Sequence, residues 1–151
     1  MAGQEEAPLE PTRSLVLDAN ILLRAVLGVR VRKLIVQYSE RVALFTPSLC
    51  LRDAQAYLPR IAKQRVWDPK PSLELLEALN VHFHVVDSAL YEHFEGQARR
   101  RIAGRDEQDW PVIALALALQ CPVWTEDADF FGSGVPTWTT RTVELYLRRE
   151  S

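Results

Sequence analysis

The sequence is poor in cysteine and in long apolar runs, and its charges nearly cancel. Among 151 residues there are two cysteines, Cys50 and Cys121, without the CxxC spacing of zinc or redox sites, so we expect two buried, reduced thiols. The longest apolar run, Val112 to Leu119, is far shorter than the ~20 residues of a membrane span. The formal net charge of -2 gives no global attraction to nucleic acid, so any such binding requires local basic patches.

The first residues differ in composition from the rest of the chain. Residues 1–13 carry three Glu and two Pro and show no apolar periodicity, which predicts a disordered leader before a single domain over residues 14–149. A signal peptide would be basic and then apolar, whereas these residues are acidic and contain proline. We therefore expect a cytoplasmic protein.

Short apolar segments alternate with segments of helical spacing along the chain. The patterns predict strands over residues 14–17, 42–45, 81–86, 122–124 and 135–138. They predict helices over 21–27, 29–39, 48 onward with a kink or end near Pro59, 71–80, 88–102, 110–119 and 141–149. Such alternation is typical of βαβ units, so the predicted fold class is α/β, with a parallel five-stranded sheet between helices.

Three aspartates are predicted to lie on one rim of this sheet. Asp18 ends the first strand, Asp127 follows the strand over 122–124, and Asp109 opens the helix that leads to that strand. In parallel sheets, sites lie outside the carboxyl ends of the strands. Three carboxylates gathered there would repel each other by ~3 kcal/mol per pair at about 5 Å and an effective dielectric of about 20. A divalent cation removes the conflict, and oxygen ligands favour Mg²⁺ or Mn²⁺.

Each aspartate also has an ordinary structural alternative. Asp18 and Asp109 stand at helix N-cap positions, and Asp127 and Asp129 stand where Asx turns are common. The coincidence of three acids on one rim favours a metal site over three separate structural roles. We expect Asp106 and Asp129 to influence this site without binding the metal themselves.

Three blocks of the sequence are similar to the PIN domain, the fold of ribonuclease toxins in VapBC-type toxin–antitoxin pairs. They are LVLDANILLRAVLG, TPSLCLRDAQAYL and RDEQDWPVIALALALQCPVWTEDADFFGSGVPTWTT. The last block has the DWPVxALAL helix and the WTxDxDF turn of one variety of the family. The resemblance covers residues 14–147 and implies a three-layer α/β/α sandwich around a parallel sheet of about five strands. It also implies a metal-dependent endoribonuclease with four acids at its site.

The resemblance assigns the four acids residue by residue. Asp18, Asp109 and Asp127 match family acids and are the implied metal ligands, and all four acids are implied to be catalytic. The family usually has Glu in the helix after the second strand, where this chain has Asp53, one methylene shorter. Asp53 therefore either completes the acid cluster, binds a water in place of the metal, or is a solvated helix acid beside Arg52.

Polar and basic residues near the acids are candidates for substrate contacts. Arg24 and Arg105 can reach phosphates of RNA, which position a nucleic acid without reading its sequence. Asn20 lies two residues after Asp18, and the Thr125 hydroxyl could hold a metal-bound water. For each cluster of basic residues a solvated face is the alternative.

The sequence thus predicts an Mg²⁺- or Mn²⁺-dependent endoribonuclease, the toxin of a type II toxin–antitoxin pair. A cognate antitoxin and homodimerisation are implied by the resemblance alone, and no membrane association is expected. One alternative is a metal-dependent phosphatase or DNA nuclease that uses the same acids. Another is a degenerate domain that binds RNA or a protein partner without cleavage, an alternative that the shorter Asp53 leaves open.

Overall fold

The fold is built on a five-stranded, all-parallel sheet, seen in a computed structural model that describes residues 13–149. The strands are β1 (Arg13–Leu17), β2 (Val42–Pro47), β3 (His84–Val86), β4 (Val123–Trp124) and β5 (Thr137–Trp138), in the spatial order β3-β2-β1-β4-β5. The chain starts in the centre with β1, adds β2 and β3 on one side and then β4 and β5 on the other. The central strand is fully buried from Leu15 to Leu17, as expected for a strand covered on both faces.

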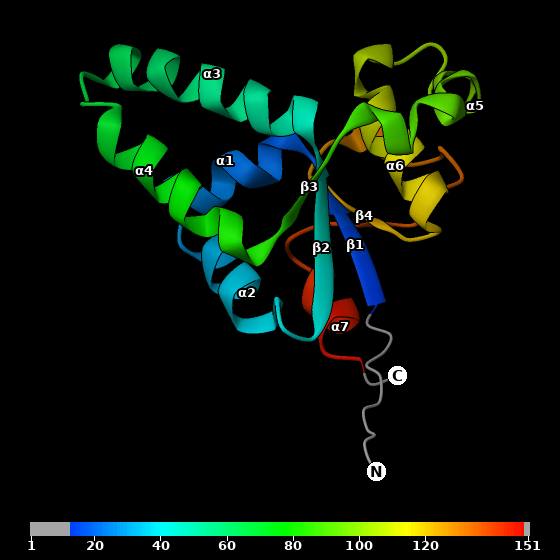
Figure 1. The fold of residues 1–151 in the computed structure, drawn as a ribbon, viewed down its shortest axis with the longest axis horizontal. Helices are drawn as coiled ribbons and strands as arrows, with labels where there is room; N and C mark the ends of the chain where they lie inside the picture. Colours follow the sequence, from blue (N-terminus) through cyan, green and yellow to red (C-terminus); the bar gives the residue numbers. More distant parts are fainter. Residues whose placement is uncertain (1–12, 150–151) are drawn as a thin grey trace.

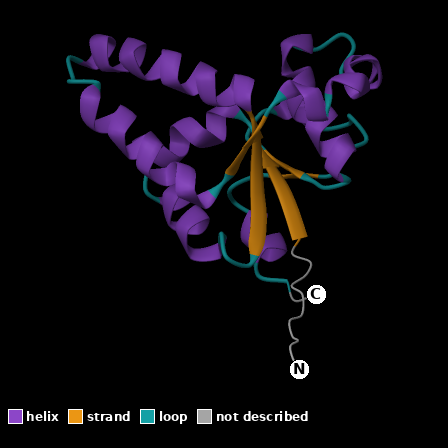
Figure 2. Ribbon diagram, viewed as in Figure 1, coloured by secondary structure: helices purple, strands orange, loops and turns teal. Residues whose placement is uncertain are grey.

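Seven α-helices in the described part of the chain cover the sheet (Figures 1 and 2). They are α1 (Ala19–Leu27), α2 (Arg30–Tyr38), α3 (Ser48–Arg65), α4 (Lys70–Leu79), α5 (Glu95–Arg101), α6 (Trp110–Leu119) and α7 (Val143–Leu147). Figure 1 shows α1 to α4 gathered on one side of the sheet and α5 and α6 on the other. The predicted α/β/α sandwich is therefore confirmed.

The apolar helix α6 forms the centre of one layer. It packs against β1 and β2, and every residue from Pro111 to Ala116 is buried. The helix ends at Gln120, which adopts a left-handed conformation (φ 54°, ψ 51°), and Pro122 then cannot continue it. No helix among residues 13–149 is long and apolar enough to cross a membrane.

Five predicted boundaries were wrong. Pro59 neither kinks nor ends its helix, because it lies on the exposed side of α3, where water can solvate the carbonyl group that loses its partner. The strand predicted over 81–86 starts only at His84, because a 3₁₀ turn occupies Asn80–His82. The helix predicted over 88–102 is reduced to α5, preceded by 3₁₀ turns at Ser88–Leu90 and Glu92–Phe94. The predicted closing helix and fifth strand are shorter than expected, at Val143–Leu147 and Thr137–Trp138.

The predicted disordered leader lies outside the described residues, apart from Arg13. Arg13 already belongs to β1, where it pairs with Val42 of β2. Both cysteines are buried, as predicted.

Candidate metal centre

The register of two strands brings the first acid to the rim. Leu17 of β1 pairs with Trp124 of β4, so the residues that follow, Asp18 and Thr125, leave the sheet side by side. The Thr125 hydroxyl donates a 2.5 Å hydrogen bond to Oδ2 of Asp18, and both residues are buried. Oδ1 of Asp18 accepts from the backbone N–H of Ile21 at 2.9 Å and so caps α1. Asp18 therefore has both the capping role and a place at the rim.

The turn after β4 holds the second acid. The backbone N–H of Asp127 donates to Oγ1 of Thr125 at 2.9 Å, and Oδ1 of Asp127 accepts from the backbone N–H of Asp129 at 2.9 Å. Asp127 is thus an Asx-turn residue, as its structural alternative predicts. Its other carboxyl oxygen takes no part in this turn.

The third acid has no structural role as a helix cap. Asp109 ends the 3₁₀ turn Glu107–Asp109 and stands at the N-cap of α6, but its side chain makes no capping hydrogen bond. Its Oδ2 is buried and has no hydrogen-bond partner among the described residues. The charge of the nearby Asp127 carboxylate is one of the causes that raise the pKa of Asp109. Because neighbouring carboxylates repel each other when ionised, protonation of Asp109 or a bound cation would relieve the repulsion.

One cavity of about 220 Å³ collects the acids from four parts of the chain. Asp18 follows β1, Asp53 lies in α3, Asp109 precedes α6 and Asp127 follows β4, and all four line this cavity. We call it the acid cavity. Asp53 is exposed and lies one and a half turns into α3, which begins directly after β2 at the same rim. The shorter side chain at this position therefore still reaches the acid cavity.

Burial and mutual repulsion raise the pKa values of two of these acids. Burial raises the pKa of Asp18 to about 6, against the hydrogen bonds from Thr125 and Ile21, which lower it. Burial, together with the nearby charges of Asp106 and Asp127, raises the pKa of Asp109 to about 7. In the absence of a cation, these two carboxyls therefore take up protons closer to neutral pH than ordinary aspartates do.

The donor set and the partnerless Oδ2 of Asp109 fit a hard divalent cation. Carboxylate oxygens are the ligands that Mg²⁺ and Mn²⁺ prefer, and these ions usually keep several waters in their shell. Within residues 13–149, no three His, Cys, Asp or Glu side chains form a ready-made cage for an ion. The four acids therefore line one cavity, but no three of them lie close enough together to hold an ion without some movement. Repulsion between carboxylates favours such a separation.

The other predicted contact residues fall into two groups. Asn20 lines the acid cavity. Thr125 does not line it, but its hydroxyl donates a hydrogen bond to Asp18. Arg24 lines a neighbouring cavity that shares Asn20, whereas the Arg105 guanidinium donates to the backbone carbonyl of Asp129 at 3.0 Å. Neither arginine lines the acid cavity.

The two residues expected to influence the site do so in different ways. Oδ1 of Asp106 accepts from the backbone N–H of Gln108 at 3.1 Å, and its charge raises the pKa of Asp109. Asp129 acts through its backbone N–H, which orients the Asp127 carboxyl.

Among the lining residues that sequence reasoning did not assign to the site, Cys50 and Gln108 are the two whose side chains carry a thiol or an amide. Cys50 lies one turn before Asp53 on α3, and Gln108 directly precedes Asp109. Helical spacing from Asp53 could have indicated Cys50.

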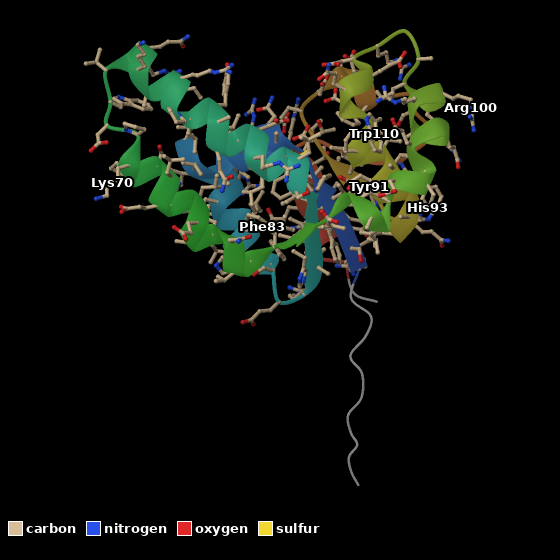
Figure 3. All side chains as sticks on the ribbon, turned by 45° about the horizontal axis from the view of Figure 1, so that its top comes forward. Lys70, Phe83, Tyr91, His93, Arg100 and Trp110 are labelled. Carbon is tan, nitrogen blue, oxygen red and sulfur yellow. The ribbon has the colours of Figure 1, made fainter. Side chains whose placement is uncertain are left out.

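Trp110, which follows Asp109 directly, is a packing residue. Its ring meets that of Tyr91 edge-on, with centroids 5.8 Å apart, and both lie in the α5–α6 side of the molecule (Figure 3). The Arg99 guanidinium lies 5.5 Å from the centre of the Trp110 ring. These contacts fix the start of α6 and therefore the position of Asp109.

The chain was compared with known families and proteins. A family model described as the PIN domain matches residues 16–148. No curated protein sequence matches the chain. The fold is similar to that of PAE2754 from Pyrobaculum aerophilum, with a TM-score of 0.68 and 18% identity, covering 89% of each chain.

Two further solved structures share the fold. VapBC2 from Rickettsia felis, bound to a DNA fragment from their promoter, matches with a TM-score of 0.64 and 15% identity, over 83% of this chain and 98% of that one. FitAcB from Neisseria gonorrhoeae matches with a TM-score of 0.57 and 17% identity, over 84% of this chain and 98% of that one. At these identities the likeness concerns the fold.

Proposed function

Because the chain belongs to the PIN domain family, we propose that it is a divalent-metal-dependent endoribonuclease. The observation that carries the proposal is the acid cavity, where Asp18, Asp53, Asp109 and Asp127 arrive from four separate elements. An all-carboxylate site suits phosphodiester hydrolysis better than zinc chemistry, which uses His and Cys ligands.

In the proposed reaction, Asp18, Asp109 and Asp127 hold Mg²⁺ or Mn²⁺, and Asp53 completes the cluster from α3. When bound, the ion lowers the pKa of a water and neutralises charge on the leaving 3′-oxygen. Thr125 orients Asp18 by donating to Oδ2, and this hydrogen bond lowers the pKa of Asp18 against the effect of burial. Because the pKa of Asp109 is raised to about 7, a proton on its carboxyl must leave before it can bind a cation, so binding is coupled to proton release.

We further propose that the chain is the toxin of a type II toxin–antitoxin pair and works with a cognate antitoxin. The supporting observations are the family and the fold shared with VapBC2 and FitAcB. The cytoplasmic location and the homodimer stay predictions.

The test compares three substrates under the same conditions. Purified protein is incubated with single-stranded RNA, DNA of the same sequence and a small phosphate monoester, with Mg²⁺ or Mn²⁺ and with or without EDTA. We expect cleavage of RNA only, abolished by EDTA and by Asp109→Asn. Cleavage of DNA or of the monoester instead would replace the proposal with the corresponding alternative.

A second measurement detects metal binding without activity. If the acids hold a cation, Mn²⁺ raises the melting temperature of the wild type but not that of Asp109→Asn. Growth arrest on expression, relieved by co-expression of an adjacent small protein, would support the toxin role. Absence of both RNA cleavage and Mn²⁺ stabilisation would leave a degenerate binding domain.

A further inference from the structure

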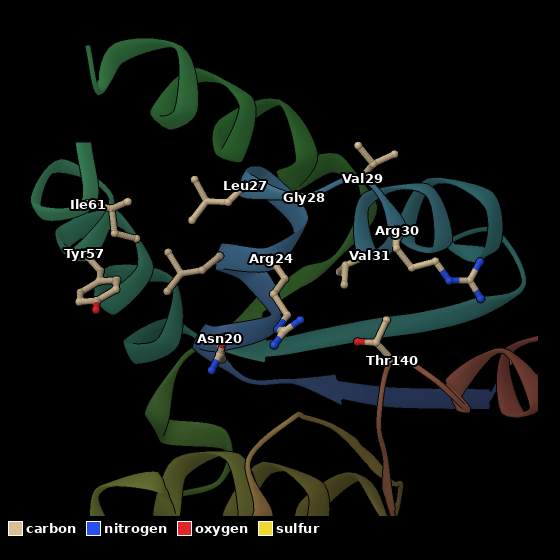
Figure 4. Close-up of a pocket in the computed structure, with 11 residues that line it drawn as sticks. Asn20, Arg24, Leu27, Gly28, Val29, Arg30, Val31, Tyr57, Ile61 and Thr140 are labelled. Atoms are coloured by element: carbon tan, nitrogen blue, oxygen red, sulfur yellow. The ribbon is translucent and has the colours of Figure 1, made fainter. Parts of the chain in front are cut away.

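A second cavity of about 420 Å³ lies beside the acid cavity, between α1, α3 and the start of α2 (Figure 4). Two helical stripes form its walls. The stripe on α1 comprises Asn20, Leu23, Arg24 and Leu27, with the spacing of one helix face. On α3, Tyr57 and Ile61 follow Asp53 at intervals of four residues, so the face that begins at the acids continues into this cavity.

The two cavities are joined by a third hollow. It is lined by Ala19, Asn20, Leu23, Asp53 and Tyr57. It shares Ala19, Asn20 and Asp53 with the acid cavity, and Asn20, Leu23 and Tyr57 with the second cavity. A continuous groove therefore runs from the acids along α1, and we call the part beyond Asp53 the Arg24–Tyr57 groove.

The charges of this groove favour an anionic occupant. Arg24 is exposed and forms no ion pair with any residue of the described chain, whereas Arg30, on the far side of the cavity, pairs with Glu144 at 3.1 Å. Figure 4 shows the Arg24 side chain between Tyr57 and Arg30. Of the two arginines that line this groove, Arg24 is therefore the one that forms no ion pair with a carboxylate of the described residues.

The apolar lining favours a base next to that anion. Tyr57 is 47% exposed, so a large part of its ring faces solvent at the groove. Aromatic rings of this kind bind bases of single strands by stacking, while arginines bind the backbone phosphates. A purely apolar peptide could pack against the leucines but would leave the Arg24 guanidinium without an anionic partner. A nucleotide strand offers both a base and a phosphate, and so fits the groove better.

We infer that the Arg24–Tyr57 groove binds the nucleotides of single-stranded RNA that flank the scissile phosphate, with Tyr57 stacking on a base and Arg24 contacting a phosphate. This inference rests on the proposed nuclease function, because it takes the acid cavity as the place of the scissile phosphate. Arg24 and Tyr57 bind substrate and take no part in the chemistry.

The test measures binding apart from cleavage. All proteins carry Asp109→Asn, so that the strand stays intact, and the probe is a fluorescein-labelled RNA octamer followed by anisotropy in Mg²⁺ at several salt concentrations. We expect Tyr57→Leu, which keeps an apolar side chain but removes the ring, to weaken binding about 5- to 100-fold, and Tyr57→Phe to keep it. Arg24→Gln should weaken binding and reduce the slope of log K against log salt by about 0.7.

Arg41→Gln is the matched control for Arg24, because Arg41 directly precedes β2 and so lies at the opposite end of the sheet from the acids. It should bind the octamer as the parent does. Equal affinity in Tyr57→Leu and the parent would fit an apolar protein segment as occupant and would overturn the inference, as would a parent that binds no octamer. RNA cleavage by the wild-type protein, measured separately, decides the nuclease function whichever way the binding result falls.

Discussion

Among the described residues, the Thr125 hydroxyl is the only side-chain group that donates a hydrogen bond to the Asp18 carboxylate. It donates to Oδ2 of Asp18 at 2.5 Å and accepts from the backbone N–H of Asp127 at 2.9 Å. One hydroxyl thus fixes two of the acids relative to each other. The register of β1 and β4 makes this possible, since it pairs Leu17 with Trp124 immediately before them.

Removal of this hydroxyl should destabilise the fold and the ionised form of Asp18. Thr125→Val preserves the shape but leaves a buried carboxylate one donor short, at a cost of about 1–3 kcal/mol in the free energy of unfolding at pH 8. Thr125→Ser keeps the donor and should lose much less. Urea unfolding at pH 8 measures both variants, and equal stabilities for them would show that the hydrogen bond is not needed.

The metal-free protein should be more stable at pH 5 than at pH 8. The folded pKa values of Asp18 and Asp109, about 6 and about 7, lie above the usual value of 3.8, so the folded state holds protons that the unfolded state has lost. Their stabilising contribution is complete below pH ~4 and disappears as the pH rises through ~7, with roughly 3 kcal/mol from Asp18.

Urea unfolding in EDTA across this pH range tests the expectation. Asp109→Asn, which cannot ionise, should flatten the slope between pH 5 and 8 and stabilise the protein at pH 8. Glu40→Gln changes an exposed carboxylate elsewhere and serves as the control. Stability that rises with pH in the wild type would contradict the electrostatic account.

Divalent cations should stabilise the protein more at pH 8 than at pH 5. The carboxylates must lose their protons before they can bind the ion, so binding competes with protonation. At an ion concentration 100 times the dissociation constant, the gain is about 2.7 kcal/mol. Thermal melting with and without Mn²⁺ at both pH values gives the comparison, and a shift of equal size at pH 5 and pH 8 would speak against binding by these acids.

Variants of Asp53 should separate a role in the acid cluster from that of a solvated helix acid. If it completes the acid cluster, Asp53→Asn lowers RNA cleavage by about 10- to 100-fold, and Asp53→Glu, which restores the usual family residue, keeps activity. Asp68→Asn, on an exposed residue after α3, is the control. Wild-type rates in Asp53→Asn would identify Asp53 as a solvated helix acid.

The sequence alone predicted a parallel five-stranded sheet and placed three of the acids at its carboxyl rim. Apolar segments such as Leu15–Leu17 and Val123–Trp124 are readable because buried parallel strands are short apolar runs, and the residue after each such run must lie at the carboxyl rim. Asp18 and Asp127 were found in this way, and Asp109 from its place before the apolar helix. Boundaries were less accurate where local signals compete, as at Pro59, whose effect depends on whether its helix face meets solvent.

Only the tertiary structure decided what surrounds these acids. The bond from Thr125 to Asp18 depends on strand register, and the partnerless Oδ2 of Asp109 depends on how α6 packs against the sheet. The groove from Asp53 past Tyr57 to Arg24 requires α1 and α3 to lie together, which no spacing within one segment encodes. Local periodicity determines which face a residue occupies, whereas contacts between segments far apart in sequence determine which faces meet.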